Sequence, residues 1–223
     1  MTGSPAIERV RDGVFFTRSP ALPRGRHTLS REQVGAAQRE RVLCAATELL
    51  AARGYAGFKP SDIARHAGVS LASFYNSFAN KDACLFAGYD RFIQVVLTML
   101  TTRQPQTNDR ARIVAALLCA YLDALANDLV VARAYQVEID ALGAQARDRR
   151  RNALQLIADA LHRIVESQSP GGIPERLTPS AYLGVVYATR QLASDALDCQ
   201  QFPDFSGLAA DLQPWIQDLF RDG

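Results

Sequence analysis

A short segment near residue 70 carries side chains that are suited to reading nucleic-acid bases. One face of a helix over residues 71–78 would present Leu71, Ala72, Ser73 and Asn76. Small and short polar side chains let a helix backbone approach base edges, where asparagine pairs with adenine, serine suits several bases and apolar groups contact the thymine methyl. This pattern predicts a DNA-reading face on which Asn76 contributes to base preference.

Aromatic residues in the same segment explain how so short a helix is held. About eight residues do not form a stable helix in isolation. Phe74 and Phe78 are four residues apart, so both rings share the inner face of the helix and can anchor it. Tyr75 lies between the two faces, where its ring can pack while its hydroxyl reaches a phosphate oxygen.

The residues before this helix predict a sharp turn and a second helix. Ala64 is small enough for two helices to cross closely, Gly68 tolerates a positive φ in the turn, and Phe74 fills the angle between the helices. Ser70 is a good N-cap for the helix that follows. This spacing indicates a helix-turn-helix, whose second helix enters the major groove of DNA.

The rest of the chain has helical periodicity and no strand alternation, which predicts an all-α protein. Pro60 starts a short helix, and Asn80 caps the helix that follows the recognition segment. The expected helices are 31–53, 60–67, 71–78, 81–102, 108–127, 129–142, 144–167, 179–199 and 206–221.

A family resemblance rests on residues 41–90, RVLCAATELLAARGYAGFKPSDIARHAGVSLASFYNSFANKDACLFAGYD. This segment resembles the DNA-binding region of the TetR family of transcriptional regulators. The resemblance implies phosphate contacts for Tyr75 and Lys81, a homodimer, and a larger helical domain that encloses a small-molecule pocket. The matching positions are Ala46, Gly54, Tyr55, Asp62, Ile63, Ala64, Ala67, Gly68, Val69, Ser70, Phe74, Tyr75, Phe78, Lys81 and Asp82.

The segment also departs from the family pattern in its DNA-contacting positions. Lys59 stands where the family usually has serine or threonine before the second helix, and its ammonium can reach the same phosphate although it cannot cap. Leu71 and Ala72 replace positions that are more often polar or glycine. An operator sequence therefore cannot be transferred from a relative.

The chain divides into three expected parts: an arm over 1–30, a helix-turn-helix DNA-binding domain over 31–82, and a helical ligand-binding and dimerisation domain over 83–223. Residues 1–91 contain 13 basic and 8 acidic residues, which favours a polyanionic partner there. Arg24 and Arg26 of the arm are candidates for a minor-groove contact. The alternative is a solvated leader, although Val10, Phe15 and Phe16 are unusually apolar for one.

Ligand and dimer residues are predicted from polar-tipped or apolar positions on the later helices. The candidate polar anchors for a ligand are Tyr121, Tyr135, Glu138 and Arg190. The apolar residues expected between subunits, or in the core behind them, are Leu183, Val186, Tyr187, Leu192, Leu212, Trp215, Ile216 and Leu219.

These observations favour a cytoplasmic, ligand-responsive transcriptional regulator, most simply a repressor that binds a near-palindromic operator as a homodimer and is released by an effector. No catalytic, metal-site or nucleotide-cofactor motif is present in the sequence, so neither an enzyme nor a cofactor is expected. The four cysteines are far apart and read as buried structural thiols. The alternative function is a helical interaction or small-molecule carrier protein with a vestigial DNA-binding motif.

Overall fold

The computed structural model describes residues 7–19, 30–102, 105–169 and 177–221, and the expected all-α fold is confirmed. The chain forms two compact units. One contains the described residues up to Phe92 together with Asp128–Leu142. The other contains Ile93–Asn127 and the described residues from Gly143 onward.

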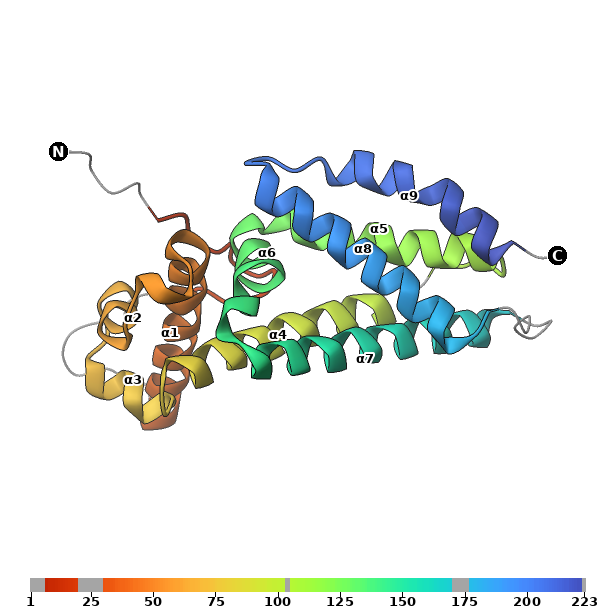
Figure 1. Cartoon of the computed structure of the whole chain (residues 1–223). Helices are drawn as coiled ribbons and strands as arrows, with labels where there is room; N and C mark the ends of the chain where they lie inside the picture. The colour runs from red at the N-terminus through yellow and green to blue at the C-terminus, as the bar shows by residue number, and fades with distance from the viewer. Residues whose placement is uncertain (1–6, 20–29, 103–104, 170–176, 222–223) are drawn as a thin grey trace. The chain divides into compact units, whose positions relative to one another are not determined.

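The first unit is built around the helix α1 (Arg31–Arg53), which contacts α2 (Pro60–Ala67), α3 (Leu71–Ser77) and α6 (Leu129–Gln136). Figure 1 shows α2 and α3 gathered against one side of α1. The unit also includes the start of α4 (Lys81–Thr102) and two short 3₁₀ helices, η1 (Tyr55–Gly57) and η2 (Glu138–Leu142). The surrounding elements bury every residue of α1 from 42 to 50, so α1 is covered on all sides there rather than along one stripe.

A non-helical segment ahead of α1, with a turn at residues 13–15, belongs to this unit. We call residues 7–19 the N-terminal strap. Its side chains Val10, Phe15 and Phe16 are buried. The ring of Phe15 lies 5.2 Å from that of Phe92 on α4. The backbone N–H of Arg11 donates to Asp128, the N-cap of α6, at 2.8 Å. Because these apolar side chains are buried, the N-terminal strap is more apolar than a solvated leader would be.

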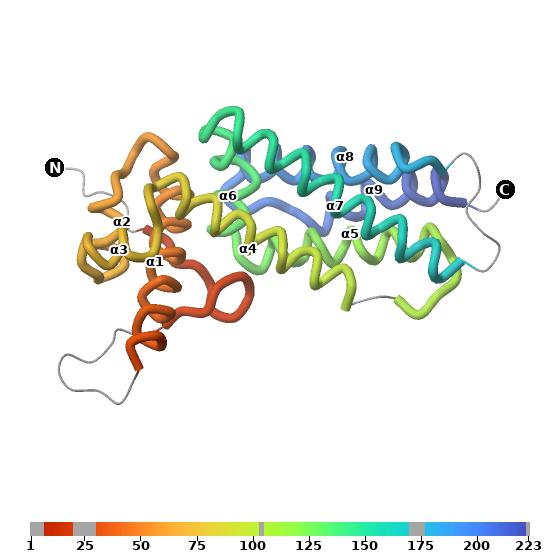
Figure 2. Tube along the Cα trace, turned by 90° about the horizontal axis from the view of Figure 1, so that it is seen from below, coloured from red at the N-terminus to blue at the C-terminus, as the bar shows by residue number. Residues whose placement is uncertain are grey.

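The second unit is a helical bundle of α5 (Arg110–Asn127), α7 (Ala144–Gln168), α8 (Pro179–Cys199) and α9 (Phe205–Phe220), with the later part of α4. Helix α5 packs along α9, and α7 packs along α8 (Figure 2). The helix α4 is long and apolar enough to span a bilayer, but half of its apolar stretch is buried inside the protein, as in a core helix.

Two expectations differ from the structure. The expected helix 129–142 breaks at Val137, and its second half is the 3₁₀ helix η2 rather than a continuation of α6. The cysteines are not all buried: Cys44 and Cys84 lie in the core, whereas Cys119 and Cys199 are exposed. The exposed pair falls on outward faces of α5 and α8, which helical periodicity alone did not assign.

Candidate nucleic-acid interface

The turn between α2 and α3 has the geometry that a helix-turn-helix requires. Gly68 adopts φ 64° and ψ 39°, the left-handed conformation that residues with a side chain avoid. The N–H of Val69 donates to the carbonyl of Ala64 at 2.9 Å, and the N–H of Gly68 donates to that of Arg65 at 3.1 Å. Ala64 is buried where the two helices approach. These bonds close the end of α2 and direct the chain into α3.

Large rings anchor the inner face of α3. Phe74 is fully buried, and its ring centroid lies 6.1 Å from that of Phe78. Tyr75 meets Phe74 edge-on, with the ring centroids 5.2 Å apart. The Ser70 hydroxyl caps the helix by accepting from the N–H of Ser73 at 3.0 Å. Packing and capping together hold a seven-residue helix that would not be stable in isolation.

The outer face of α3 is open to solvent. Ala72 and Asn76 are exposed, and Ser73 is half-buried. Leu71 is 43% exposed and Tyr75 is 52% exposed, which is unusual for large apolar side chains that are placed together on one short helix. The Tyr75 hydroxyl makes no hydrogen bond to any described residue, so it is free to donate to a phosphate. This surface therefore brings the exposed side chains predicted to contact bases next to an exposed phenol hydroxyl.

The start of α2 is held by a carboxylate rather than a hydroxyl. The Asp62 carboxylate accepts from the backbone N–H of Lys59 at 2.9 Å. This hydrogen bond holds the pKa of Asp62 below its ordinary value, with a further contribution from Arg65, which forms an ion pair with it. Lys59 makes no side-chain cap, as expected, and is exposed at the N-terminus of α2. Its ammonium is available to an anion there.

Lys81 lies at the start of α4, but its ammonium is directed into the protein. The Nζ atom donates to the carbonyls of Tyr55 at 2.7 Å and Phe58 at 3.1 Å. It also lies 3.9 Å from the ring centroid of Tyr55. Burial lowers the pKa of Lys81. The ammonium has three N–H groups, so these two hydrogen bonds leave one donor for a phosphate. The adjacent cap by Asn80, which accepts from Ala83 N–H at 2.8 Å, is independent of it.

Two arginines of α1, which were not predicted from the sequence, stabilise the carbonyl ends of α2 and α3. Arg39 donates to the carbonyl of Ser77 at 2.9 Å and stacks 4.1 Å from the ring centroid of Phe78. Arg41 donates to the carbonyl of Gly68 at 3.3 Å. Cations at helix C-termini complement the helix dipole. Helical spacing within α1 carries no signal of these contacts between separate helices.

The predicted ligand anchors are divided between the two units. Tyr135 and Glu138 belong to the first unit, where Tyr135 is buried and Glu138 is half-buried. Tyr121 on α5 and Arg190 on α8 belong to the second unit, where they are half-buried and buried respectively. The four residues therefore do not form one cluster within a unit. Arg24 and Arg26 lie outside the described residues.

Two buried hydroxyls in the second unit went unpredicted. Tyr182 and Thr189 lie on α8, are at most 1% exposed, and have no hydrogen-bond partner among the described residues. The ring of His162 on α7 lies 4.7 Å from that of Tyr182. Buried hydroxyls ordinarily have a partner, so each of these two leaves a hydrogen bond for a water or a ligand group.

The predicted dimer residues differ in exposure. Val186, Leu212 and Ile216 are buried within the second unit. The remaining side chains are half-buried or exposed on α8 and α9: Leu183, Tyr187, Leu192, Trp215 and Leu219. Phe202, just before α9, is 79% exposed and was not predicted.

Residues 42–87 match the family model of bacterial regulatory proteins, tetR family, which confirms the resemblance found in the sequence. No curated protein matches the chain.

Solved structures share the fold over most of the chain. The transcriptional regulator FadR from Bacillus subtilis, solved with stearoyl-CoA, has a TM-score of 0.70 at 20% identity and covers 79% of this chain and 96% of its own. A tetR-family regulatory protein from Rhodococcus RHA1 has a TM-score of 0.65 at 19% identity, with 82% and 96% covered. NalD of Pseudomonas aeruginosa, the secondary repressor of the MexAB-OprM multidrug efflux pump, has a TM-score of 0.64 at 20% identity, with 85% and 100% covered.

Proposed function

We propose, from the match of residues 42–87 to the tetR family of bacterial regulatory proteins, that this chain represses transcription by binding a near-palindromic operator as a homodimer and that a small-molecule effector releases it. The matched family consists of DNA-binding regulators rather than enzymes, which supports the proposal. The observation that carries the proposal is the solvent-exposed face of α3, held by Phe74 behind the left-handed turn at Gly68.

In this proposal α3 enters the major groove. Asn76 and Ser73 contact base edges, and Leu71 and Ala72 contact apolar groups such as the thymine methyl. Tyr75 donates its exposed hydroxyl to a phosphate, and Lys59 supplies a cation beside the N-terminus of α2. The Ser70 hydroxyl oxygen accepts from the N–H of Ser73 as the cap of α3, and in this proposal the same hydroxyl contacts DNA.

Dimerisation through α8 and α9 is supported by side chains left uncovered there. Tyr187 is 39% exposed, and Leu192 and Trp215 are each 42% exposed. Large apolar side chains in such numbers favour an interface between subunits. Two recognition helices in a dimer would read half-sites about 34–36 Å apart, one turn of DNA.

The effector is proposed to bind in the second unit. The support is the pair of buried hydroxyls without partners, Tyr182 and Thr189, with His162 beside the first. A ligand polar group that accepts or donates a hydrogen bond would remove the cost of leaving them unsatisfied. The FadR structure with stearoyl-CoA is a precedent, within the same fold, for a protein that binds an acyl-CoA.

DNA binding is tested by selecting sequences from a random pool with the full chain and measuring the selected DNA by fluorescence anisotropy across a salt series. Scrambled DNA of the same length is the control. We expect tight and sequence-selective binding. The logarithm of the association constant should fall linearly with the logarithm of the salt concentration, because each phosphate contact releases counterions. A selection that yields no preferred sequence would instead favour the carrier with a vestigial motif.

Dimerisation is tested by sedimentation of Leu192→Asp, with Leu156→Asp as the matched control. Leu156 is a leucine of similar exposure, 52%, on α7. The proposal expects a dimer for the original chain and the control, and a monomer for Leu192→Asp. Dimers of equal stability in all three would contradict the assigned interface.

A further inference from the structure

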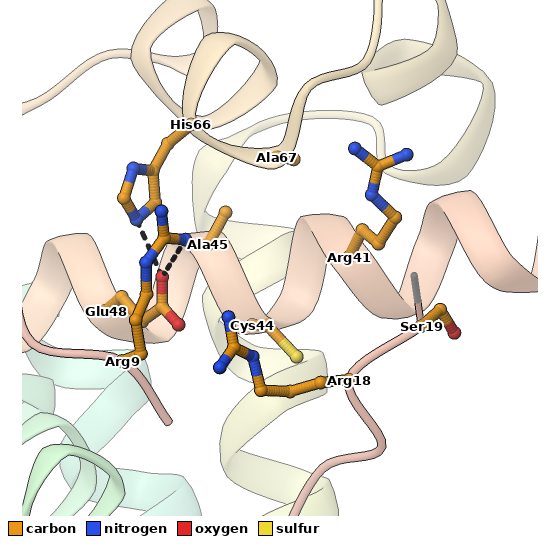
Figure 3. A pocket seen from close by; sticks show the side chains of 9 residues that line it. All are labelled: Arg9, Arg18, Ser19, Arg41, Cys44, Ala45, Glu48, His66 and Ala67. Atoms are coloured by element: carbon orange, nitrogen blue, oxygen red, sulfur yellow. Dashed lines mark hydrogen bonds and ion pairs between the residues drawn. The ribbon is translucent and has the colours of Figure 1, made fainter. Parts of the chain in front are cut away.

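An open cavity of about 240 Å³ lies within the first unit, between the N-terminal strap, α1 and α2. Figure 3 shows its lining side chains: Arg9 and Glu48 stand on one side, Arg41 on the other, and Arg18 extends beneath Cys44. Ala45 and Ala67 complete the buried part of the wall together with the Cys44 thiol. The cavity therefore combines a buried floor with a rim of three arginines.

The acidic group in the cavity is already neutralised. Glu48 is 1% exposed, and its carboxylate accepts from Arg9 at 3.0 Å and from the backbone N–H of Val10 at 3.1 Å. His66 lies 2.7 Å from the same carboxylate. Glu40, the other acidic group close to Cys44, forms an ion pair with Arg91 and accepts from Thr17 N–H at 2.9 Å. Neither carboxylate lacks a partner.

Two cations at the cavity have no carboxylate partner. The Arg18 side chain makes no hydrogen bond or ion pair to any described residue, and only its backbone N–H is engaged, by Asp12. Arg41 uses one nitrogen on the carbonyl of Gly68 and forms no ion pair within the described part of the chain. With Arg9 opposed by Glu48, an excess of two positive charges faces the cavity.

We propose that this cavity is a binding site for a phosphate group, held between Arg18 and Arg41 with the Ser19 hydroxyl at the rim. The guanidinium fork matches the oxygens of a phosphate and can donate two hydrogen bonds to it. The cavity is smaller than the roughly 300–1,000 Å³ of sites for drug-sized ligands, which suits a small anion or a single phosphate group of a larger molecule.

The position of the site gives binding a consequence. The strap supplies Arg9, Arg18 and Ser19, whereas Arg41 holds the carbonyl of Gly68 in the helix-turn-helix. A bound phosphate would link the strap to the turn that directs α3. The phosphate group could belong to a free phosphorylated anion or to the DNA backbone, and these two sources predict different effects on DNA binding.

The site is tested by thermal melting of the full chain in increasing inorganic phosphate, with sodium chloride adjusted to keep ionic strength constant. A ligand that binds only the folded state raises the melting temperature with its concentration. The apparent dissociation constant for phosphate is expected to rise about tenfold or more in Arg18→Gln and less in Arg18→Lys, which keeps the charge but loses the fork. The matched control is Arg147→Gln, an exposed arginine on α7.

Each variant is compared by the change in its own melting temperature that phosphate causes. A different melting temperature without phosphate therefore does not affect the comparison. No shift in the original chain, or an equal shift in Arg18→Gln, would overturn the proposal. Because this experiment contains no DNA, its failure is distinct from a failure of the proposed regulatory function.

A second experiment with the selected DNA separates the sources of the phosphate. If the cavity takes a backbone phosphate, Arg18→Gln reduces the slope of log K against log salt by about 0.9, and inorganic phosphate competes with DNA. If it takes a free phosphorylated anion, the slope is unchanged and the DNA complex still binds phosphate. Either result supports a phosphate site once the melting experiment has shown one.

Discussion

The hydroxyls of Tyr135 and Thr47 lie 2.8 Å apart in a buried hydrogen bond that joins α6 to α1. Thr47 also donates to the carbonyl of Leu43 at 2.8 Å, so Tyr135 is the donor to Thr47. Burial raises the pKa of Tyr135, which keeps its proton in place. A Cβ at position 88 would lie 1.9 Å from the tyrosine oxygen, so Gly88 is required for α4 to pass this close. Tyr135 thus has a structural partner within the first unit.

This hydrogen bond predicts unequal costs for its two partners. Tyr135→Phe removes the donor and leaves Thr47 bonded to Leu43, so we expect a loss of about 1 kcal/mol in the free energy of unfolding. Thr47→Val leaves a fully buried tyrosine hydroxyl without a partner, and we expect a loss of about 2–3 kcal/mol. Denaturant melts of both variants measure the difference. Equal losses would indicate that the tyrosine finds another acceptor.

The turn at Gly68 gives a prediction with an internal control. Gly68→Ala places a side chain at φ 64° and 2.6 Å from Arg41 Nη2, so we expect destabilisation of about 1–2 kcal/mol and loss of the Arg41 bond. Gly35→Ala, on an exposed and open part of α1, should stabilise the protein by about 0.5–1 kcal/mol. Thermal melts compare the two. A neutral Gly68→Ala would contradict the left-handed geometry.

Asp62 gives a pH-dependent prediction. Its folded-state pKa lies below the ordinary value near 3.8 because its carboxylate accepts from Lys59 N–H, so its stabilisation is present above that pH and is lost as the pH falls through the folded pKa. We expect Asp62→Asn to be less stable than the original chain at pH 7 and the difference to shrink below about pH 4. Denaturant melts across this range measure it. A difference that does not change with pH would show that the charge contributes nothing.

The helix-turn-helix was predictable because its determinants are local. The conformation of Gly68, the caps by Ser70 and Asn80, and the pairing of Phe74 with Phe78 each depend on residues within a few positions of one another. The family model over residues 42–87 covers this same region. Local side-chain chemistry and the family match therefore point to the same segment, because residues close together in the sequence determine its structure.

Features that depend on distant contacts were not predictable from spacing. The strap is ordered against α1 by Glu48, 38 positions beyond Val10, and against α6 by Asp128, 117 positions beyond Arg11. The resemblance implies a phosphate contact for Lys81, but spacing gives no sign of the carbonyls of Tyr55 and Phe58 that accept hydrogen bonds from its ammonium. The exposed faces of α5 and α8, with Cys119 and Cys199, likewise depend on which helices pack beside them.

If the exposed face of α3 reads DNA sequence, a side chain on that face must contribute to the selectivity of DNA binding. Selectivity is the dissociation constant for scrambled DNA divided by that for selected DNA at fixed salt, compared between the original chain and Asn76→Ala, with Arg147→Gln as control. We predict that Asn76→Ala lowers this ratio about 5- to 150-fold, equivalent to roughly 1–3 kcal/mol, while binding to scrambled DNA is unchanged. An unchanged ratio in Asn76→Ala would contradict the assignment of this residue to base recognition and of α3 to the major groove.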